Sequence, residues 1–146
     1  NSKILDIGCG KAFLLHEIKL ILPQISIYGF DVSKYAISKS TKLIKPFLKI
    51  AKAEEKYPYK KNFFDLSISI STLHNLEIFN LKKAFKEIER VSKNGYLVVE
   101  SYRNEKELFN LQCWALTCQT FLSVKEWIWL YKKIKYKGDY EFIFFN

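Results

Sequence analysis

Segments typical of β-strands alternate with segments typical of helices along most of this 146-residue chain. Short β-rich, apolar stretches predict strands over residues 3–7, 25–30, 47–51, 64–71, 96–100 and 141–145. Apolar residues at helical spacing predict helices over 12–22, 33–45, 80–91 and 123–136. Ser33 and Asn80 are the expected N-caps of two of these helices, and Gly95 is an expected C-cap. We therefore expect an α/β fold, a doubly wound and mostly parallel sheet with helices on both faces.

Composition places the chain among ordinary globular domains. Its hydrophobic content of 49% is too high for a disordered protein, and its length predicts one domain over residues 1–146. No apolar run approaches the roughly 18 residues that span a bilayer, and the start has no signal-peptide layout, so no membrane association is expected. The three cysteines, Cys9, Cys113 and Cys118, suit neither a disulfide framework nor a metal site. The prediction is a cytoplasmic protein without a bound metal.

The net charge of +9 comes almost entirely from lysine, because Arg90 and Arg103 are the two arginines. Five lysines follow one another along one segment: Lys34, Lys39, Lys42, Lys45 and Lys49. One interpretation is a patch for RNA, DNA or acidic lipid. The other is a solvated surface in a lysine-rich protein. The shortage of the forked guanidinium favours the second, so nucleic acid is not the expected partner.

The turn after the first predicted strand reads Asp6-Ile7-Gly8-Cys9-Gly10. Two glycines let the backbone pass tightly under a ligand at a helix N-terminus. The dinucleotide fingerprint needs a small residue where Phe13 stands, and Asp6 would repel a phosphate. A carboxylate there suits a cationic ligand, and S-adenosylmethionine carries a sulfonium and an ammonium.

Asp31 lies 21 residues beyond Gly10, at the end of the second predicted strand. A carboxylate in that place can accept hydrogen bonds from both hydroxyls of a ribose. Taken alone, Asp31 is equally well a helix cap. Together with the glycine turn in one β-α-β unit, it points to a nucleoside ligand.

Three stretches, LDIGCGKAFLL, YGFDVSKYAI and AKAEEKYPYKKNFFDLSISISTLHNL, resemble the class I S-adenosylmethionine-dependent methyltransferases of the small-molecule-type branch. The resemblance covers about residues 3–100 and implies an enzyme of EC 2.1.1 type, with S-adenosyl-L-methionine as cofactor and S-adenosyl-L-homocysteine as product. The cofactor-binding residues that it implies are Asp6, Gly8, Cys9, Gly10, Asp31, Val32, Ala53, Glu54, Ser69 and Ile70.

Lys52 departs from the family pattern, because many members place there an Asp that accepts from the adenine amino group. A lysine has donors only. Either Glu54 replaces this acceptor or the adenine contacts are weaker.

Candidate catalytic and substrate residues follow the fourth and fifth predicted strands. His74 is a candidate general base near neutral pH, with a purely structural capping role as the alternative. Tyr102 and Arg103 are candidates for binding the substrate, and Arg103 could hold an acidic group bidentately. Trp114 lies in the apolar segment 104–122, where family members commonly place a substrate-covering insertion.

The expected function is methyl transfer to a small molecule. An N-P-P-Y motif, which amino-methyltransferases acting on DNA and RNA carry after the fourth strand, is replaced here by Ser69-Ile70-Ser71-Thr72. Two alternatives stay open: an RNA methyltransferase using the lysine-rich face, and a non-catalytic cofactor-binding scaffold. The family's sheet usually has seven strands and six are predicted, so the chain is expected to be truncated at both ends. An exposed edge strand then predicts a homodimer or modest stability.

Overall fold

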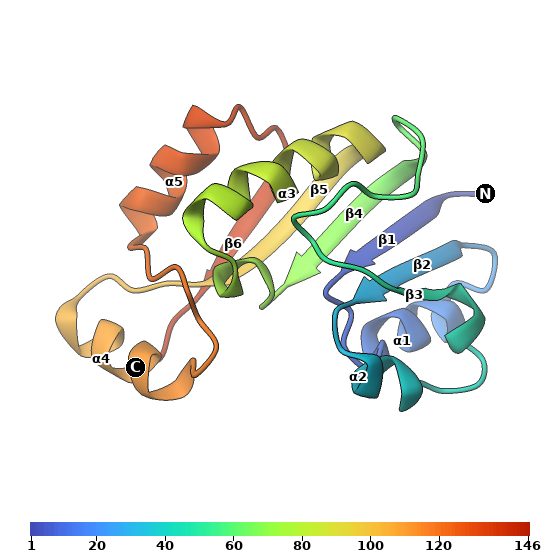
Figure 1. The fold of residues 1–146 in the computed structure, drawn as a ribbon, viewed down its shortest axis with the longest axis horizontal. Helices are drawn as coiled ribbons and strands as arrows, with labels where there is room; N and C mark the ends of the chain where they lie inside the picture. Colours follow the sequence, from blue (N-terminus) through green and yellow to red (C-terminus); the bar gives the residue numbers. More distant parts are fainter.

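The computed structural model describes residues 1–146, whose six strands form a single sheet in the order β3-β2-β1-β4-β5-β6 (Figure 1). All five strand pairings are parallel, which confirms the predicted doubly wound sheet. The strands are β1 (Lys3–Ile7), β2 (Ser26–Asp31), β3 (Leu48–Ile50), β4 (Phe64–Ile70), β5 (Ser92–Glu100) and β6 (Asp139–Ile143). The strand order reverses between β1 and β4, where open α/β sheets place their ligand sites.

Helices cover both faces of the sheet (Figure 1). They are α1 (Phe13–Ile21), α2 (Lys34–Ser38), α3 (Ile78–Val91), α4 (Glu105–Trp114) and α5 (Val124–Lys133), with short 3-10 helices η1 (Lys45–Phe47) and η2 (Leu73–Asn75). α3 and α5 lie on one face and α1 and α2 on the other, while α4 lies beyond the carboxyl end of β5. No helix combines the length and the apolar character that a membrane crossing requires.

The two faces of the sheet bury separate hydrophobic clusters. The larger one packs β1, β4 and β5 against α3 and α5, and it includes Leu5, Phe85 and Trp127. The smaller one, between the sheet and α1, includes Leu15 and Ile27. Since β1 is covered on both faces, residues 4–7 are apolar or buried and do not show the in–out alternation of a half-exposed strand.

Three sequence predictions about helix ends were wrong. The helix expected to reach Lys45 ends at Ser38, because the hydroxyls of Ser38 and Ser40 donate to helix carbonyls of Tyr35 and Ile37 and compete with the helical ladder. Asn80 lies inside the first turn of α3, whose N-cap is Glu77.

Gly95 lies within β5 and is not a helix C-cap. A Cβ at this position would lie 2.6 Å from the Tyr136 hydroxyl oxygen, so the glycine serves close packing.

The segment 104–122 forms α4 followed by an irregular stretch that returns to the end of β4. Asn104 caps α4 by accepting from the Glu107 N–H. Leu111 and Cys118 belong to a small hydrophobic cluster that is separate from the two clusters on the faces of the sheet. Ser123 and Glu126 then form a capping box that begins α5. Residues 115–122 therefore lie over the carboxyl end of the sheet rather than on either face.

The tryptophans of α5 provide a test of this packing. Trp127 is fully buried in the larger cluster, whereas Trp129 is 60% exposed. We expect Trp127→Ala to lower the free energy of unfolding by about 3–5 kcal/mol, and Trp129→Ala to change it by less than about 0.5 kcal/mol. Urea unfolding of both variants measures the difference, and equal effects would contradict this packing.

Candidate functional site

The turn between β1 and α1 has a backbone that favours glycine. Gly8 and Gly10 have φ values of +75° and +56°, in the left-handed region. A Cβ on Gly8 would lie 2.2 Å from the Thr72 Oγ1, so the turns after β1 and β4 meet only because Gly8 has no side chain. The N–H groups of Gly8 and Cys9 both donate to the Phe30 carbonyl, which fixes this turn beside the end of β2.

Asp31 joins the turns after β1 and β2. Its Oδ2 accepts from the Gly10 N–H at 2.9 Å, and its Oδ1 accepts from the Ser33 N–H at 2.8 Å. Each carboxylate oxygen has a second lone pair, so both can accept one more hydrogen bond. Asp31 is therefore a fixed acceptor at the switch point of the sheet.

Asp6 is buried beneath this turn, with 5% of its surface exposed. Burial, and then the charge of Asp31, raise the pKa of Asp6 to about 7. Burial and the same two carboxylates raise the pKa of the Cys9 thiol to about 12, so Cys9 is not a nucleophile at neutral pH. The negative charge gathered at Asp6 and Asp31 favours a cationic ligand.

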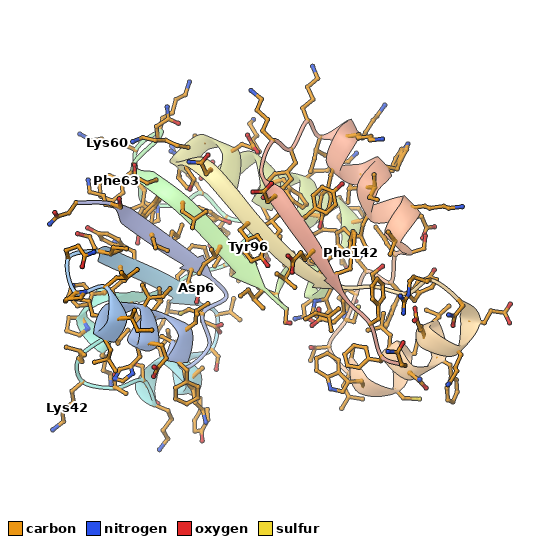
Figure 2. The ribbon with its side chains drawn as sticks, turned by 180° about the vertical axis from the view of Figure 1, so that it is seen from behind. Asp6, Lys42, Lys60, Phe63, Tyr96 and Phe142 are labelled. Atoms are coloured by element: carbon orange, nitrogen blue, oxygen red, sulfur yellow. The ribbon has the colours of Figure 1, made fainter.

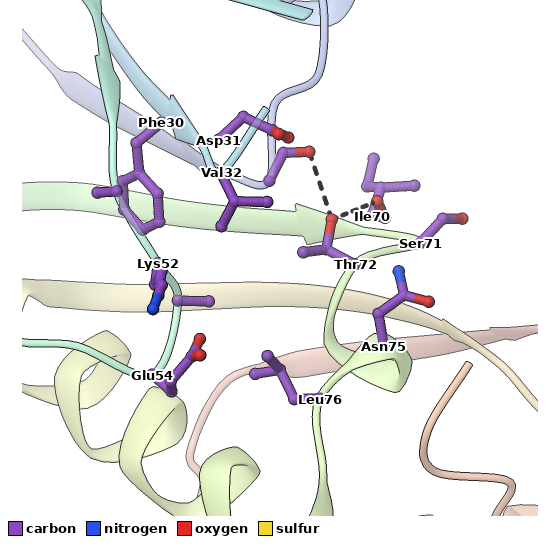
Figure 3. Close-up of a pocket in the computed structure, with 13 residues that line it drawn as sticks. Phe30, Asp31, Val32, Lys52, Glu54, Ile70, Ser71, Thr72, Asn75 and Leu76 are labelled. Carbon is purple, nitrogen blue, oxygen red and sulfur yellow. Dashed lines mark hydrogen bonds between the residues drawn. The ribbon is translucent and has the colours of Figure 1, made fainter. Parts of the chain in front are cut away.

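A cavity of about 530 Å³ opens at the carboxyl ends of β1, β2 and β4 (Figure 3). Its volume lies in the range of small-molecule sites. The turns after three strands and the loop after β3 supply its lining: Gly8, Phe30, Asp31, Val32, Ala51, Lys52, Ala53, Glu54, Ile70, Ser71, Thr72, Asn75 and Leu76.

Hydrogen bonds to α3 anchor the loop after β3. The Tyr57 hydroxyl donates to the Ala53 carbonyl at 2.8 Å, and the Tyr57 N–H donates to Glu87 Oε2 at 2.7 Å. Arg90 donates to the carbonyls of Tyr57 and Tyr59 as well as to Glu87. One of the two arginines thus holds the wall of the cavity that carries Ala53.

Six of the ten residues predicted to bind the cofactor line this cavity. They are Gly8, Asp31, Val32, Ala53, Glu54 and Ile70. Asp6, Cys9, Gly10 and Ser69 do not line it. Ser69 is buried and donates to the Ile7 carbonyl, so it ties β4 to β1.

His74 lies behind the cavity rather than in its wall. It is 3% exposed, and its Nδ1 lies 2.6 Å from Oε2 of Glu100, which is 1% exposed. Its role as a general base stays a prediction.

The predicted substrate residues, Tyr102, Arg103 and Trp114, also lie outside the cavity lining. Arg103 forms an ion pair with Glu107, and its guanidinium carbon lies 4.0 Å from the centre of the Phe144 ring. Trp114 is 54% exposed and packs against Phe145. Their substrate contacts stay a prediction.

Sequence reasoning missed the residues just beyond β4 that line the cavity: Ser71, Thr72, Asn75 and Leu76. The rule that ligands bind at the carboxyl ends of strands pointed to this turn. It could not rank the residues within it, and histidine attracted the prediction because it is titratable.

Asp6 gives a pH-dependent prediction for stability. Its pKa is raised from 3.8 to about 7 on folding, so the native protein loses stability as the pH rises from about 4 through about 7. An asparagine at this position cannot ionise, so the variant Asp6→Asn escapes this loss. We expect the difference in melting temperature, Asp6→Asn minus the unchanged protein, to be several degrees larger at pH 8 than at pH 5.

Asp65→Asn is the matched control for this experiment. Hydrogen bonds from Lys93 and Lys3 lower the pKa of Asp65, so Asp65 is ionised and stabilises the fold fully at both pH values. The difference in melting temperature between Asp65→Asn and the unchanged protein should therefore be the same at pH 5 and pH 8. A constant difference for Asp6→Asn as well would show that Asp6 is ionised throughout.

Comparison with known proteins gives one consistent family. A family model described as a methyltransferase domain matches residues 1–144. A tRNA (carboxymethyluridine(34)-5-O)-methyltransferase of Arabidopsis thaliana is 35% identical over 133 residues, which cover 88% of this chain and 30% of that protein. The arginine-hydroxylase NDUFAF5 of Mus musculus is 28% identical over 109 residues, covering 75% of this chain and 31% of that protein. The chain thus spans about a third of the length of these relatives.

Solved structures agree in fold. The YcgJ protein of Bacillus subtilis superposes with a TM-score of 0.73 at 19% identity, covering 92% of this chain and 61% of that one. Geranyl diphosphate C-methyltransferase of Streptomyces coelicolor, solved with S-adenosyl-L-homocysteine, gives 0.70 at 14% identity, covering 91% and 53%. With its parallel sheet, its glycine turn and a family match over nearly its whole length, the chain belongs to the class I S-adenosylmethionine-dependent methyltransferases.

Proposed function

We propose that residues 1–146 form one core that binds S-adenosyl-L-methionine and transfers its methyl group to a small molecule. The observation that carries this proposal is the Asp31 carboxylate, fixed by two backbone N–H groups and lining a cavity at the switch point of the sheet. When bound, the cofactor supplies an electrophilic methyl group on a sulfonium.

The residues present fit the nucleoside half of this cofactor. Asp31 has free lone pairs for both ribose hydroxyls. Val32 is 62% exposed at the cavity and offers an apolar surface to the adenine. Glu54 lines the cavity beside Lys52, whose Nζ lies 3.5 Å from Glu55, so Glu54 is the acceptor we assign to the adenine amino group (Figure 3).

The turn after β1 fits the amino-acid half. Gly8 and Gly10 let the backbone approach a ligand, and a Cβ on Gly10 would meet no atom within 4 Å, so this side of the turn is open. Asp6 lies below with its raised pKa, and an ammonium group above it would favour the carboxylate form. Ser69 ties β4 to β1 through the Ile7 carbonyl, and the Cys9 N–H holds the turn beside the end of β2. Ile70 completes the set by lining the cavity from β4.

The cavity aligns the reactants rather than activating them chemically. Ile70 and Leu76 supply apolar surface to the cavity that Asp31 and Gly8 also line. Alignment of nucleophile, methyl carbon and sulfur in a dry site can lower the barrier by several kcal/mol. We assign His74 a positioning role, because its contact with Glu100 ties η2 to β5 behind the cavity. A role as the base is the alternative.

A second candidate acceptor is RNA, favoured by the tRNA methyltransferase among the relatives. Residues 32–53 contain six lysines and no acid. Tyr35 and Phe47, exposed by 64% and 40%, lie among these lysines and could stack on bases. Figure 2 shows Lys42 pointing away from the body of the molecule on this side.

Three further expectations stay predictions of the sequence. They are the homodimer, the cytoplasmic location and the alternative of a non-catalytic scaffold.

Cofactor binding is tested by calorimetric titration with S-adenosyl-L-homocysteine. We expect Asp31→Asn to weaken binding by at least about tenfold, because a neutral amide forms weaker hydrogen bonds to the ribose than a carboxylate does. Asp65→Asn, at the amino end of β4, is the matched control and should bind normally. Equal affinity of all three proteins would contradict the assignment of Asp31.

The two acceptor classes differ in salt dependence. If RNA is the acceptor, the affinity for a tRNA should fall steeply between 50 and 200 mM salt, by about 10³-fold or more if six phosphates are contacted. Fluorescence anisotropy with labelled tRNA measures this. We expect weak binding that Lys34→Gln with Lys42→Gln does not change, and tight, steeply salt-dependent binding lost in that variant would favour RNA.

A further inference from the structure

We propose that Asn75 selects the methyl acceptor and that the acceptor presents a carboxylate to it. This inference rests on the proposed methyltransferase function and names the substrate class of the same cavity.

Asn75 offers the cavity a pair of unused hydrogen-bond donors. It lines the cavity from η2, and its amide nitrogen points toward Ser71 and Thr72 in Figure 3. Its Oδ1 already accepts from the Thr117 hydroxyl at 3.0 Å, which fixes the orientation of the amide. The two Nδ2 hydrogens are therefore left for a ligand.

The neighbouring Thr72 hydroxyl is occupied within the protein. The Thr72 hydroxyl is shared between the carbonyls of Gly8 and Ile70, at 3.3 and 3.2 Å. The Ser71 side chain also lines this wall, next to Thr72. On the wall that follows β4, the amide of Asn75 is thus a donor group whose orientation is already fixed.

The segment 117–120 clamps η2 from behind. The His74 carbonyl accepts from the N–H groups of Gln119 and Thr120, at 3.1 and 3.0 Å. The Thr120 hydroxyl donates to the Leu76 carbonyl at 2.5 Å, and the buried pair of His74 and Glu100 ties η2 to β5. Because these contacts flank Asn75 on both sides, its amide is held in place before any ligand binds.

The distribution of charge in the cavity favours a carboxylate at this position. The lining has three titratable residues, all on the wall assigned to the nucleoside: Asp31 ends β2, and Lys52 and Glu54 follow β3. The wall that follows β4 is neutral and presents donors. A carboxylate accepts two such hydrogen bonds and is ionised at neutral pH without a general base, whereas an ammonium would meet another donor.

The reaction then balances without a proton acceptor. One carboxylate oxygen forms a bond to the methyl carbon while the bond from that carbon to sulfur breaks, and its electron pair stays on sulfur. The products are a methyl ester and a neutral thioether, so the positive charge of the sulfonium and the negative charge of the carboxylate cancel.

The test uses the full chain with cofactor labelled by tritium in the methyl group. The acceptors are a panel of straight-chain and aromatic carboxylic acids, with the amines and alcohols of the same skeletons. Mild base releases the methyl group of an ester as volatile methanol and leaves methylamines and methyl ethers intact. We expect label to transfer to acids of the panel and to be volatile after base.

The variant Asn75→Asp places a carboxylate where the donors were. We expect it to raise the KM for the best acid by about tenfold or more, with the affinity for S-adenosyl-L-homocysteine unchanged. Thr117→Val, at the surface contact, should raise that KM less, because the amide loses its orientation only. Asn80→Asp, which keeps the contact with Lys83, is the matched control and should leave both values unchanged.

Failure of this inference differs from failure of the proposed function. Base-stable transfer to amines or alcohols would overturn the carboxylate assignment while supporting a methyltransferase. An unchanged KM in Asn75→Asp would overturn the role of Asn75. Absence of transfer to any acceptor by a protein that binds S-adenosyl-L-homocysteine would overturn both.

Discussion

The contact between Gly8 and Thr72 sets the geometry on which the cavity depends. β1 and β4 are neighbours at the point where the strand order reverses, so their turns must diverge to opposite faces while passing close together. Gly8 makes this approach feasible because any Cβ would overlap Thr72. Asp31 then joins the turn after β1 to the turn after β2. The result is a cavity whose floor is backbone and whose side walls come from separate strands.

Electrostatics divide this cavity into two unlike halves. Buried Asp6 and partly exposed Asp31 lie together beneath the turn after β1, where burial, and then the charge of Asp31, raise the pKa of Asp6 to about 7. The wall after β4 is neutral, because Ser71, Thr72, Asn75 and Leu76 carry no titratable group. A cation is favoured on one side and a hydrogen-bond acceptor on the other, which suits the transfer from a sulfonium to a carboxylate that we propose.

Sequence patterns predicted the sheet well because the strands read as short stretches rich in apolar and β-branched residues, and the central strands β1, β2, β4 and β5 are more buried than the edge strands β3 and β6. They were weaker where local and tertiary preferences compete. Lys39 to Lys45 has helical spacing, yet serine hydroxyls end α2 at Ser38. Gly95 follows a helix, yet it lies in β5 because Tyr136 fills the space beside it. Neither contact is visible from the order of the residues.

The sequence by itself determined the fold, the glycine turn and the acidic residues Asp6 and Asp31, since these depend on periodicity and on short spacings within one β-α-β unit. Only the tertiary structure decided which residues after β4 face the cavity. His74 and Asn75 are adjacent in sequence, but the 3-10 turn buries one against Glu100 and leaves the other in the cavity wall. That choice depends on β5 and on the segment 117–120, which lie far away in the chain and contact η2 only after folding.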